Sequence, residues 1–254
     1  MQFKEIRIGW KTPFPDECVQ WVRDKYGLEG EAARRRVGTL WGGRLSTRLG
    51  QGCECVADLV MELSGPIKND AVSVLRVQCV DDPALEGVEP PSGGFCEARI
   101  LYDPWPFFLT EDELKRKEIA LEIVVMGLEA LQRSRGIDLS AALSACRRAR
   151  EMGLRCERLS RPKKSPSGRA AVVSIVRHTY AYVVRVAIYG KSGQMLYSDE
   201  VCRGGPSMWF AADECLGGSR WSGETFEMRS DWGFSFSRSF EGPGRDAAEG
   251  GGAE

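Results

Sequence analysis

Residues 109–136, LTEDELKRKEIALEIVVMGLEALQRSRG, carry the clearest structural signal in the chain. Thr110 and Glu113 have the spacing of a capping box, and acidic residues fill the first predicted turn, where the helix dipole favours negative charge. Apolar side chains then recur at helical period, and Gly136 follows in the position of a C-terminal cap. We therefore predict a long amphipathic helix over this stretch.

A second helical pattern, DLSAALSACRRAREMG at residues 138–153, follows almost at once. Two helices joined by so short a connection tend to pack side by side in antiparallel fashion. Each also needs a surface on which to bury its apolar stripe. The two patterns together predict a helical hairpin over residues 110–153, packed on one face of a sheet.

The segments before the hairpin predict strands and one short helix. FKEIRIGW at residues 3–10 alternates like a strand, and PDECVQWVRDKYG at residues 15–27 has the proline, acids and final glycine of a helix. Three more apolar runs are separated by turn-rich pieces and predict a three-stranded antiparallel meander: CECVADLVMEL (53–63), AVSVLRVQCV (71–80) and GFCEARILY (94–102). Residues 1–160 are thus expected to form an α+β region.

The segments after the hairpin predict strands alone. Residues 161–168, RPKKSPSG, form a basic loop and the best internal boundary. Residues 169–240 predict an antiparallel meander, in the same sheet or in a second one, in which a strand from Ala171 to Tyr189 turns at GKSG into the next strand. SMWFAAD at residues 207–213 is taken as a later strand, and residues 241–254 as a disordered tail. The predicted fold class is α+β, mainly antiparallel.

Composition limits the range of partners and compartments. The chain has 254 residues, with 35 basic residues against 36 acidic ones, so no global charge favours nucleic acid or a membrane surface. No signal peptide or membrane-length apolar run is present. The nine cysteines are scattered through apolar patterns, which indicates reduced thiols and a cytoplasmic protein. The arginine-rich, asparagine-poor composition is associated with bacterial chains.

His178 is the only histidine, within IVRHTYAYVVRVAI at residues 175–188. In a strand it shares the more apolar face with Tyr180 and Tyr182, so we predict a buried structural histidine, bonded to a tyrosine or the backbone. One imidazole cannot build a histidine-based zinc site, and no paired-cysteine or phosphate-loop motif is present. No metal or cofactor is expected, and an enzyme is disfavoured. The fallback catalytic pair is His178 with Cys202.

Two surface features favour binding of a partner. The run from Arg147 to Lys164 is strongly basic, and several aromatic residues lie near proline and glycine in the predicted connections. Such rings add contact area at interfaces, although they also close sheet cores, and a basic run also occurs as a solvated helix face. The residues predicted to bind a partner are Trp105, Phe107, Trp209, Trp221, Arg147, Arg148 and Arg150.

These observations lead to one expected function and two alternatives. We expect a cytosolic protein-binding module that masks a partner protein, most concretely a bacterial immunity or inhibitor protein against a toxin. The first alternative is a small hydrolase that uses carboxylates or a Cys–His pair. The second is a nucleic-acid accessory protein that uses the basic run at residues 147–164, which is disfavoured because no aromatic residues interleave with the cations. The oligomeric state is left open.

Overall fold

The computed structural model describes residues 1–11, 16–38, 43–205, 209–231 and 233–240. The chain forms two compact units. The first comprises Met1–Cys156 together with Arg177–Ala181, and the second comprises Glu157–Val176 together with the residues from Tyr182 onward. Helices and sheets are both present and the sheets are mostly antiparallel, which confirms the predicted α+β class.

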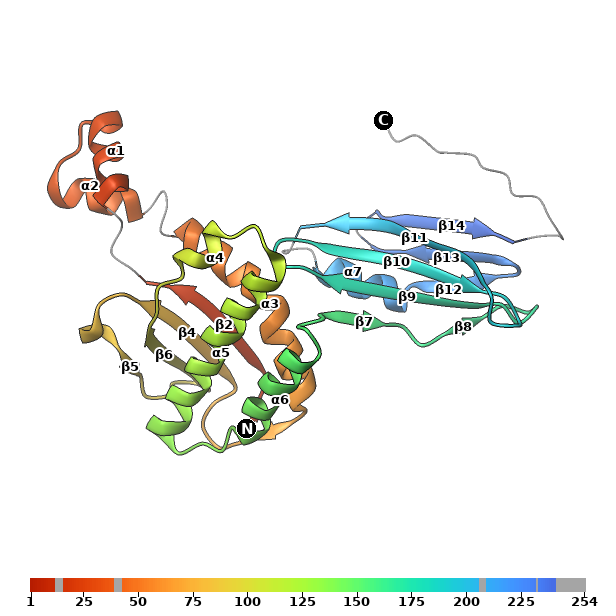
Figure 1. The fold of residues 1–254 in the computed structure, drawn as a ribbon, viewed down its shortest axis with the longest axis horizontal. Helices are drawn as coiled ribbons and strands as arrows, with labels where there is room; N and C mark the ends of the chain where they lie inside the picture. Colours follow the sequence, from red (N-terminus) through yellow and green to blue (C-terminus); the bar gives the residue numbers. More distant parts are fainter. Residues whose placement is uncertain (12–15, 39–42, 206–208, 232, 241–254) are drawn as a thin grey trace. The chain divides into compact units, whose positions relative to one another are not determined.

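The first unit is built on a four-stranded sheet with the order β2–β4–β6–β5 (Figure 1). The three longer strands are parallel, and β5 is antiparallel to β6. The bounds of the strands are β2 (Glu5–Trp10), β4 (Val74–Val80), β5 (Gly87–Val88) and β6 (Phe95–Leu101). Parallel strands require long crossovers, and the chain between β2 and β4 supplies one whose described residues are mainly helical.

The two faces of this sheet have opposite character. Ile8 lies beside Val77 and Val77 beside Ala98, and all three side chains are buried. The alternate residues, such as Arg7 and Arg76, point to the other face and are partly or fully exposed. The sheet is therefore half-buried, with its helices on the apolar face.

Four helices cover or adjoin the apolar face (Figure 1). They are α3 (Gly43–Ser64), α4 (Trp105–Leu109), α5 (Glu113–Arg135) and α6 (Ser140–Glu151). α5 packs directly on the strands, and α6 packs on α3 and α5. α5 ends at Gly136, which adopts the left-handed conformation expected of a C-terminal cap. The predicted helical hairpin on one face of the sheet is confirmed.

Smaller elements complete the first unit. β1 (Gln2–Phe3) pairs with β3 (Ile67–Lys68), and Pro83–Leu85 forms a 3-10 turn. α1 (Asp16–Tyr26) and α2 (Gly30–Val37) pack on each other around a small apolar cluster of their own. The predicted short helix over residues 15–27 is confirmed for Asp16–Tyr26.

The predicted strand over residues 53–63 is wrong, because these residues form the second half of α3. Val56 and Val60 are buried one helical turn apart, as a helix requires. Gly52 also lies inside this helix. A Cβ atom at Gly52 would stand 2.5 Å from the ring of Phe107, so the helix needs glycine for close packing.

The predicted antiparallel meander is also wrong. β4 and β6 do form over the expected residues, but they are parallel neighbours with β2 on the other side of β4. The connection between β4 and β6 returns along the edge through β5 before β6 begins. Alternation of apolar residues identifies a strand but carries no information on its direction.

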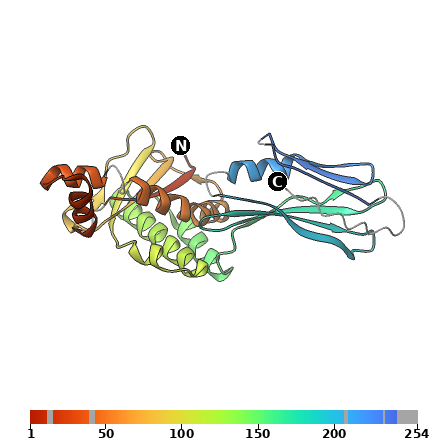
Figure 2. The same cartoon turned by 90° about the horizontal axis from the view of Figure 1, so that it is seen from above.

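The second unit consists of antiparallel sheets around a separate apolar core, which Figure 2 shows as two layers. One sheet has the order β11–β10–β9–β7, with β8 also paired to β9, and the other has the order β12–β13–β14. The strands of the first are β7 (Glu157–Leu159), β8 (Lys163–Lys164), β9 (Ala170–Arg177), β10 (Tyr182–Tyr189) and β11 (Met195–Gly204). Those of the second are β12 (Ser219–Ser222), β13 (Thr225–Arg229) and β14 (Ser235–Ser239).

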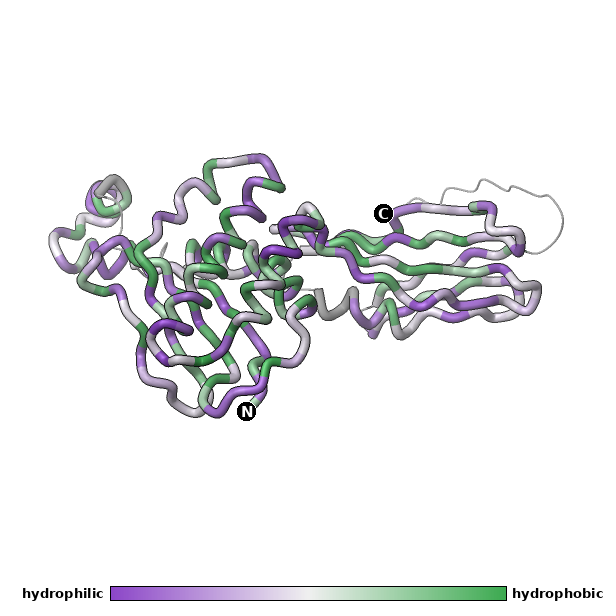
Figure 3. The backbone as a smooth tube through the Cα atoms, turned by 60° about the horizontal axis from the view of Figure 1, so that its bottom comes forward, coloured by the Kyte–Doolittle hydropathy of each residue, from purple (hydrophilic) through white to green (hydrophobic). Residues whose placement is uncertain are grey.

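Apolar and polar residues follow one another along the strands of this unit (Figure 3). In β10, Val184, Val186 and Ile188 are buried, whereas Arg185 between them is exposed. β10 turns into β11 at residues 190–193, so the predicted hairpin is confirmed. The core between the layers draws residues from both sheets, including Ile175 and Phe226.

Two predicted strands of this region are corrected by the structure. The run Ala171–Tyr189 is interrupted between β9 and β10, so His178 is not in a strand. The strand predicted at residues 207–213 is also wrong, because the chain from Trp209 onward belongs to helix α7 (Trp209–Gly217). The predicted tail at residues 241–254 lies outside the described residues.

In the second unit, polar side chains join separate elements of the chain at two places. Lys163 donates to the backbone oxygens of Leu216, Gly217 and Ser219, and so caps the C-terminal end of α7, where a cation is favoured. Glu224 accepts from the N–H of Ser167 at 3.0 Å and from its hydroxyl at 2.7 Å, and it pairs with Arg169. These bonds lower the pKa of the Glu224 carboxyl, chiefly through the side chain of Ser167.

We predict that Gly127→Ala destabilises the chain. Gly127 of α5 faces β4, and a Cβ atom there would stand 2.3 Å from Cγ2 of Val77. Overpacking costs about 1–3 kcal/mol, which outweighs the gain of up to about 1 kcal/mol in helix propensity. Urea denaturation followed by circular dichroism measures the change. Ser134→Ala at an exposed position of the same helix is the control, and a Gly127→Ala variant as stable as wild type would contradict this packing.

We also predict that Glu224 makes the second unit sensitive to acid. Its pKa is lower in the folded chain than its ordinary value of 4.5, so its stabilising contribution is complete above that pH. The contribution is lost as the pH falls through the folded pKa. Thermal midpoints of wild type and Glu224→Gln should differ by a constant amount at pH 6–8 and converge below about pH 4.5. A gap that widens in acid would contradict the prediction.

Candidate functional site

The chain reverses direction between β9 and β10 over residues 177–181, which belong to the first unit. The His178 N–H donates to the Ala181 oxygen at 2.7 Å and closes the reversal. Arg177 and Thr179 are buried, whereas the side chain of His178 is 36% exposed. The prediction of a buried His178 in a central strand is therefore wrong. In the chain reversal that replaces the strand, Arg177 and Thr179 face inward and His178 does not.

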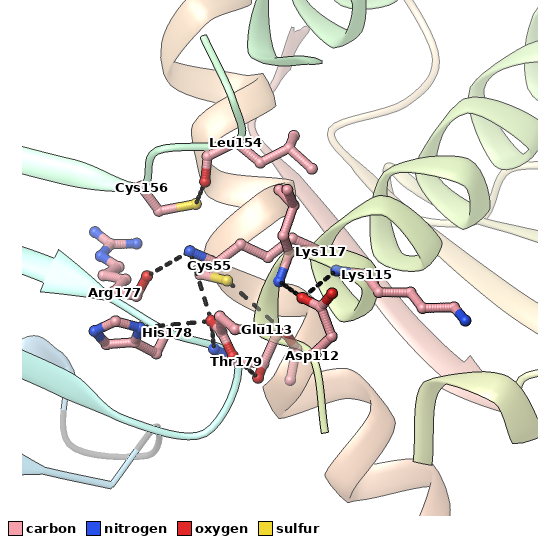
Figure 4. Close-up of polar contacts among 12 residues, drawn as sticks. Cys55, Asp112, Glu113, Lys115, Lys117, Leu154, Cys156, Arg177, His178 and Thr179 are labelled. Atoms are coloured by element: carbon pink, nitrogen blue, oxygen red, sulfur yellow. Dashed lines mark hydrogen bonds and ion pairs between the residues drawn. The ribbon is translucent and has the colours of Figure 1, made fainter. Parts of the chain in front are cut away.

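The carboxylate of Glu113 holds this reversal in place (Figure 4). One oxygen accepts from the N–H of Thr179 at 2.8 Å, and the other accepts from its hydroxyl at 2.7 Å. Asp112 caps the start of α5 by accepting from the N–H groups of Leu114 and Lys115. The capping box predicted from Thr110 and Glu113 is therefore wrong. Asp112 is the N-cap of α5, and the carboxylate of Glu113 binds the chain reversal instead.

Two buried cations complete the network. Lys117, only 7% exposed, donates to the backbone oxygen of Arg177 at 3.1 Å, and its ammonium lies 3.6 Å from Glu113. The guanidinium of Arg177 is bound by Asp58 of α3, with Glu62 at 4.0 Å. Buried charges need such partners, and these contacts tie the reversal to both α3 and α5.

Two buried thiols lie beside the network, Cys55 in α3 and Cys156 after α6 (Figure 4). A hydrogen bond from Cys55 lowers the pKa of Cys156, and the positive charges of Lys117 and Arg177 act in the same direction. The same hydrogen bond, together with burial, raises the pKa of Cys55 well above its ordinary value. Cys156 is therefore the more easily ionised thiol of the pair.

The network holds the chain reversal in position, and it separates the two residues of the predicted catalytic pair. The imidazole Nδ1 of His178 lies 3.6 Å from a Glu113 oxygen that already accepts from Thr179. Cys202, the other member of the predicted pair, belongs to the second unit, where its neighbour is Tyr182. Burial raises the pKa of that tyrosine to about 12. In the structure, His178 therefore lies near the carboxylate of Glu113, and Cys202 lies near the phenol group of Tyr182.

Three of the four aromatic residues predicted to bind a partner pack against other described residues of the chain. Phe107 is completely buried, and Trp105 packs edge to face on Trp10 with ring centroids 5.1 Å apart. Trp221 is half-buried in the second unit, and its indole N–H donates to the Lys163 oxygen at 2.9 Å. Trp209 lies in α7, and its side chain is outside the described part of the structure.

The predicted arginines are on the surface of α6. Arg147, Arg148 and Arg150 are exposed, whereas Ala142, Cys146 and other small residues of the helix face inward. Arg148 donates to the backbone oxygen of Leu63 at the end of α3. The guanidinium groups of Arg147 and Arg150 make no hydrogen bond or ion pair with another described residue.

A trough of about 260 Å³ between β2 and α3 was not predicted from the sequence. Consecutive strand residues and one side of the helix line it: Glu5, Ile6, Arg7, Ile8, Gly50, Gln51, Glu54, Ala57 and Asp58. The helical spacing of Gly50, Glu54 and Asp58 was the available signal, but it was obscured because residues 53–63 were assigned to a strand.

Comparisons with protein-family models, curated proteins and solved structures gave no match for this chain. Within the described ranges, no helix has the length and apolar character needed to span a bilayer. The same ranges contain no group of three or more histidine, cysteine or acidic side chains arranged to hold a metal ion.

We predict that Glu113→Ala lowers the free energy of unfolding by about 3 kcal/mol, because it removes two hydrogen bonds to a charged acceptor and the counter-charge of Lys117. Glu113→Gln keeps one acceptor oxygen and should lose less. His178→Ala should cost under about 1 kcal/mol, since the imidazole is partly exposed.

Chemical denaturation of these variants provides the measurement. Glu118→Ala, at an exposed position of the same helix, is the matched control and should stay within about 0.5 kcal/mol of wild type. A larger loss for His178→Ala than for Glu113→Ala would assign the central role to the histidine instead.

Proposed function

We propose that the chain is a cytosolic protein-binding module that masks an acidic surface of a partner protein, in its most concrete form a bacterial immunity protein against a toxin. The supporting observation is the pair Arg147 and Arg150, which are exposed on α6 and whose guanidinium groups make no hydrogen bond or ion pair with another described residue. Residues three apart on a helix are neighbours, so the two guanidinium groups are available to one surface.

The surroundings of this pair favour an acidic partner. The only acidic residue in α6 is Glu151, so the arginines give this helix a positive surface. A positive surface of this kind increases the rate of encounter with an acidic protein. Arginine also binds carboxylates through two parallel hydrogen bonds, which makes it common at the centre of interfaces.

The structure also changes which predicted residues support the proposal. Trp105 and Phe107 pack within the first unit, so they do not form the predicted binding surface there. The exposed arginines of α6 carry the proposal instead. Trp209 and Trp221 of the second unit stay a prediction. The enzyme alternative gains no support from His178, because the nearest acid is occupied by Thr179.

The test is an affinity purification from the native host at low salt, with wild type compared to the double variant Arg147→Glu/Arg150→Glu. We expect one protein to be recovered with wild type and at least tenfold less with the double variant. Arg133→Glu, at an exposed position of α5, makes one substitution of the same kind outside α6 and should recover it fully. Thermal midpoints of both variants should match wild type, because surface substitutions rarely change stability.

Three outcomes would contradict the proposal. One is recovery of the same proteins with the double variant, and another is recovery of the chain alone. The third is co-purification that disappears on nuclease treatment, which would favour the nucleic-acid alternative and a steep dependence on salt. If a partner is found, the immunity form further predicts that wild type, but not the double variant, relieves the partner's toxicity to cells.

A further inference from the structure

Two arginines from different helices meet at one tyrosine of the first unit. Tyr180 lies in the chain reversal, and its ring packs against Phe107 with ring centroids 6.0 Å apart. The guanidinium carbon of Arg48 in α3 lies 5.5 Å from the centre of the Tyr180 ring. That of Arg116 in α5 lies 5.4 Å from the same point. Both cations are therefore within reach of a single group bound beside this ring.

Close packing on both helices sets the position of Tyr180. At Gly52 of α3, a Cβ atom would stand 3.2 Å from the Tyr180 ring, so the ring lies directly on the helix backbone. Arg48 is four residues earlier, on the same side of that helix. On α5, Glu113 binds the residue before Tyr180, and Arg116 is three residues further on, where side chains are neighbours. Ordered helices therefore place both arginines beside the ring.

Neither of these two arginines has a counter-charge. The guanidinium groups of Arg48 and Arg116 make no hydrogen bond or ion pair with a residue in the described ranges. The acidic residues one turn before Arg116 have other partners, since Asp112 accepts from the backbone of α5 and Glu113 accepts from Thr179. The first turn of α3 contains no acidic residue. Two positive charges thus lie beside the ring without a carboxylate bound to them.

The cluster also holds hydrogen-bond donors that lack acceptors. A guanidinium has five N–H donors, and one attraction to an aromatic ring leaves most of them unused. The Nε of Arg116 and the hydroxyl of Tyr180 are buried and have no hydrogen-bond partner in the described part of the chain. Burial raises the pKa of Tyr180, and the positive charges of Arg48 and Arg116 oppose that rise. The hydroxyl is therefore protonated at neutral pH and able to donate.

Charge and shape select the anion that suits these donors. A phosphate monoester carries about −1.5 to −2 charges at pH 7 and presents three acceptor oxygens. Arginine binds phosphate through two parallel hydrogen bonds, so two guanidinium groups can share the oxygens of one phosphate. A carboxylate or a phosphodiester carries a single charge and would balance only one of the two arginines. The cluster therefore favours a phosphate monoester.

We propose that the cluster of Arg48, Arg116 and Tyr180 binds a phosphate monoester group. Each guanidinium donates to the phosphate oxygens, and the Tyr180 hydroxyl donates to the same group. Arg48 is exposed, so its long side chain can turn from the ring to admit the anion. Arg44, one turn earlier on α3 and also exposed, adds a third positive charge on that side of the helix. The site is separate from the arginines of α6 and does not depend on the partner proposed for them.

The experiment titrates the full chain with phenyl phosphate, phenyl sulfate and benzoate in a calorimeter. Phenyl sulfate has the same tetrahedral shape as phenyl phosphate but a single negative charge. We expect phenyl phosphate to bind at least tenfold more tightly than either of the other two anions, because only the phosphate balances both arginines. Inorganic phosphate should compete with it. In NMR spectra of the arginine side chains, the Nε–H signal of Arg116 should shift on binding.

Variants divide the site into its parts. Arg48→Ala and Arg116→Ala should each weaken phenyl phosphate at least tenfold. Arg116→Lys keeps the charge but not the paired donors and should weaken it about threefold, which keeps the test valid if Arg116→Ala unfolds the chain. Tyr180→Phe keeps the ring and removes the hydroxyl, so we expect a loss of about threefold. Arg133→Ala, at an exposed position of α5, removes the same charge elsewhere on that helix and should bind as wild type does.

A further probe identifies the source of the phosphate. A blocked pentapeptide with a central phosphoserine represents a phosphorylated protein, whereas phenyl phosphate represents a small organic phosphate. Binding of the peptide at least tenfold tighter would assign the phosphate to a protein, and equal or weaker binding would assign it to a small molecule. Arg147→Glu/Arg150→Glu should bind both probes normally, so failure here is distinguishable from failure of the α6 surface.

Several results would overturn the proposal. Equal binding of phenyl phosphate and phenyl sulfate would exclude recognition of the doubly charged group. An equal loss in Arg48→Ala and Arg133→Ala would reduce the effect to net charge. Tighter binding of a single-stranded oligonucleotide without a terminal phosphate would assign the arginines to a phosphodiester backbone instead.

Discussion

The completely buried Thr179 gives both of its hydrogen bonds to one carboxylate, that of Glu113. An unpaired polar group at this depth would cost free energy, so the chain reversal at residues 177–181 is stable only while α5 supplies that acceptor. The same reversal delivers Arg177 to Asp58 and a backbone oxygen to Lys117. α3, α5 and the reversal are therefore held by one connected set of contacts, and loss of the carboxylate of Glu113 or Asp58 removes a counter-charge from a buried cation, Lys117 or Arg177.

Close backbone approach is the second constraint on the first unit. α3 touches the outer edge of β2 at Gly50 and the aromatic cluster at Gly52, and α5 touches β4 at Gly127. In each case a methyl group would overlap a neighbour, so the helix layer lies nearer to the sheet than larger residues would permit. This proximity allows Ser46 to reach the Trp10 N–H, and it determines where the trough begins.

Sequence reasoning succeeded where the local signal is strong. The period of the α5 stripe and the terminal glycine predicted the helical hairpin, and alternation predicted β2, β4, β6 and β10. It failed where tertiary contacts decide: residues 53–63 were predicted as a strand because the packing of Gly50 and Gly52 against neighbours distant in sequence is not visible locally, and strand direction has no local signature. The candidate sites follow the same division. The exposure of Arg147 and Arg150 was predictable from helical period, whereas the partnership of Glu113 with Thr179 spans 66 residues and no spacing rule reports it.

The partial cover over β2 also bears on self-association. A long bare strand edge templates pairing with other copies, and proteins protect such edges with helices or charges. Here α3 runs along the outer edge of β2: Ser46 accepts from the Trp10 N–H, and the helix backbone at Gly50 touches the Ile8 oxygen. A helix held this close occupies the side on which another strand would have to pair, so the edge of β2 is protected against pairing with a second copy of the chain.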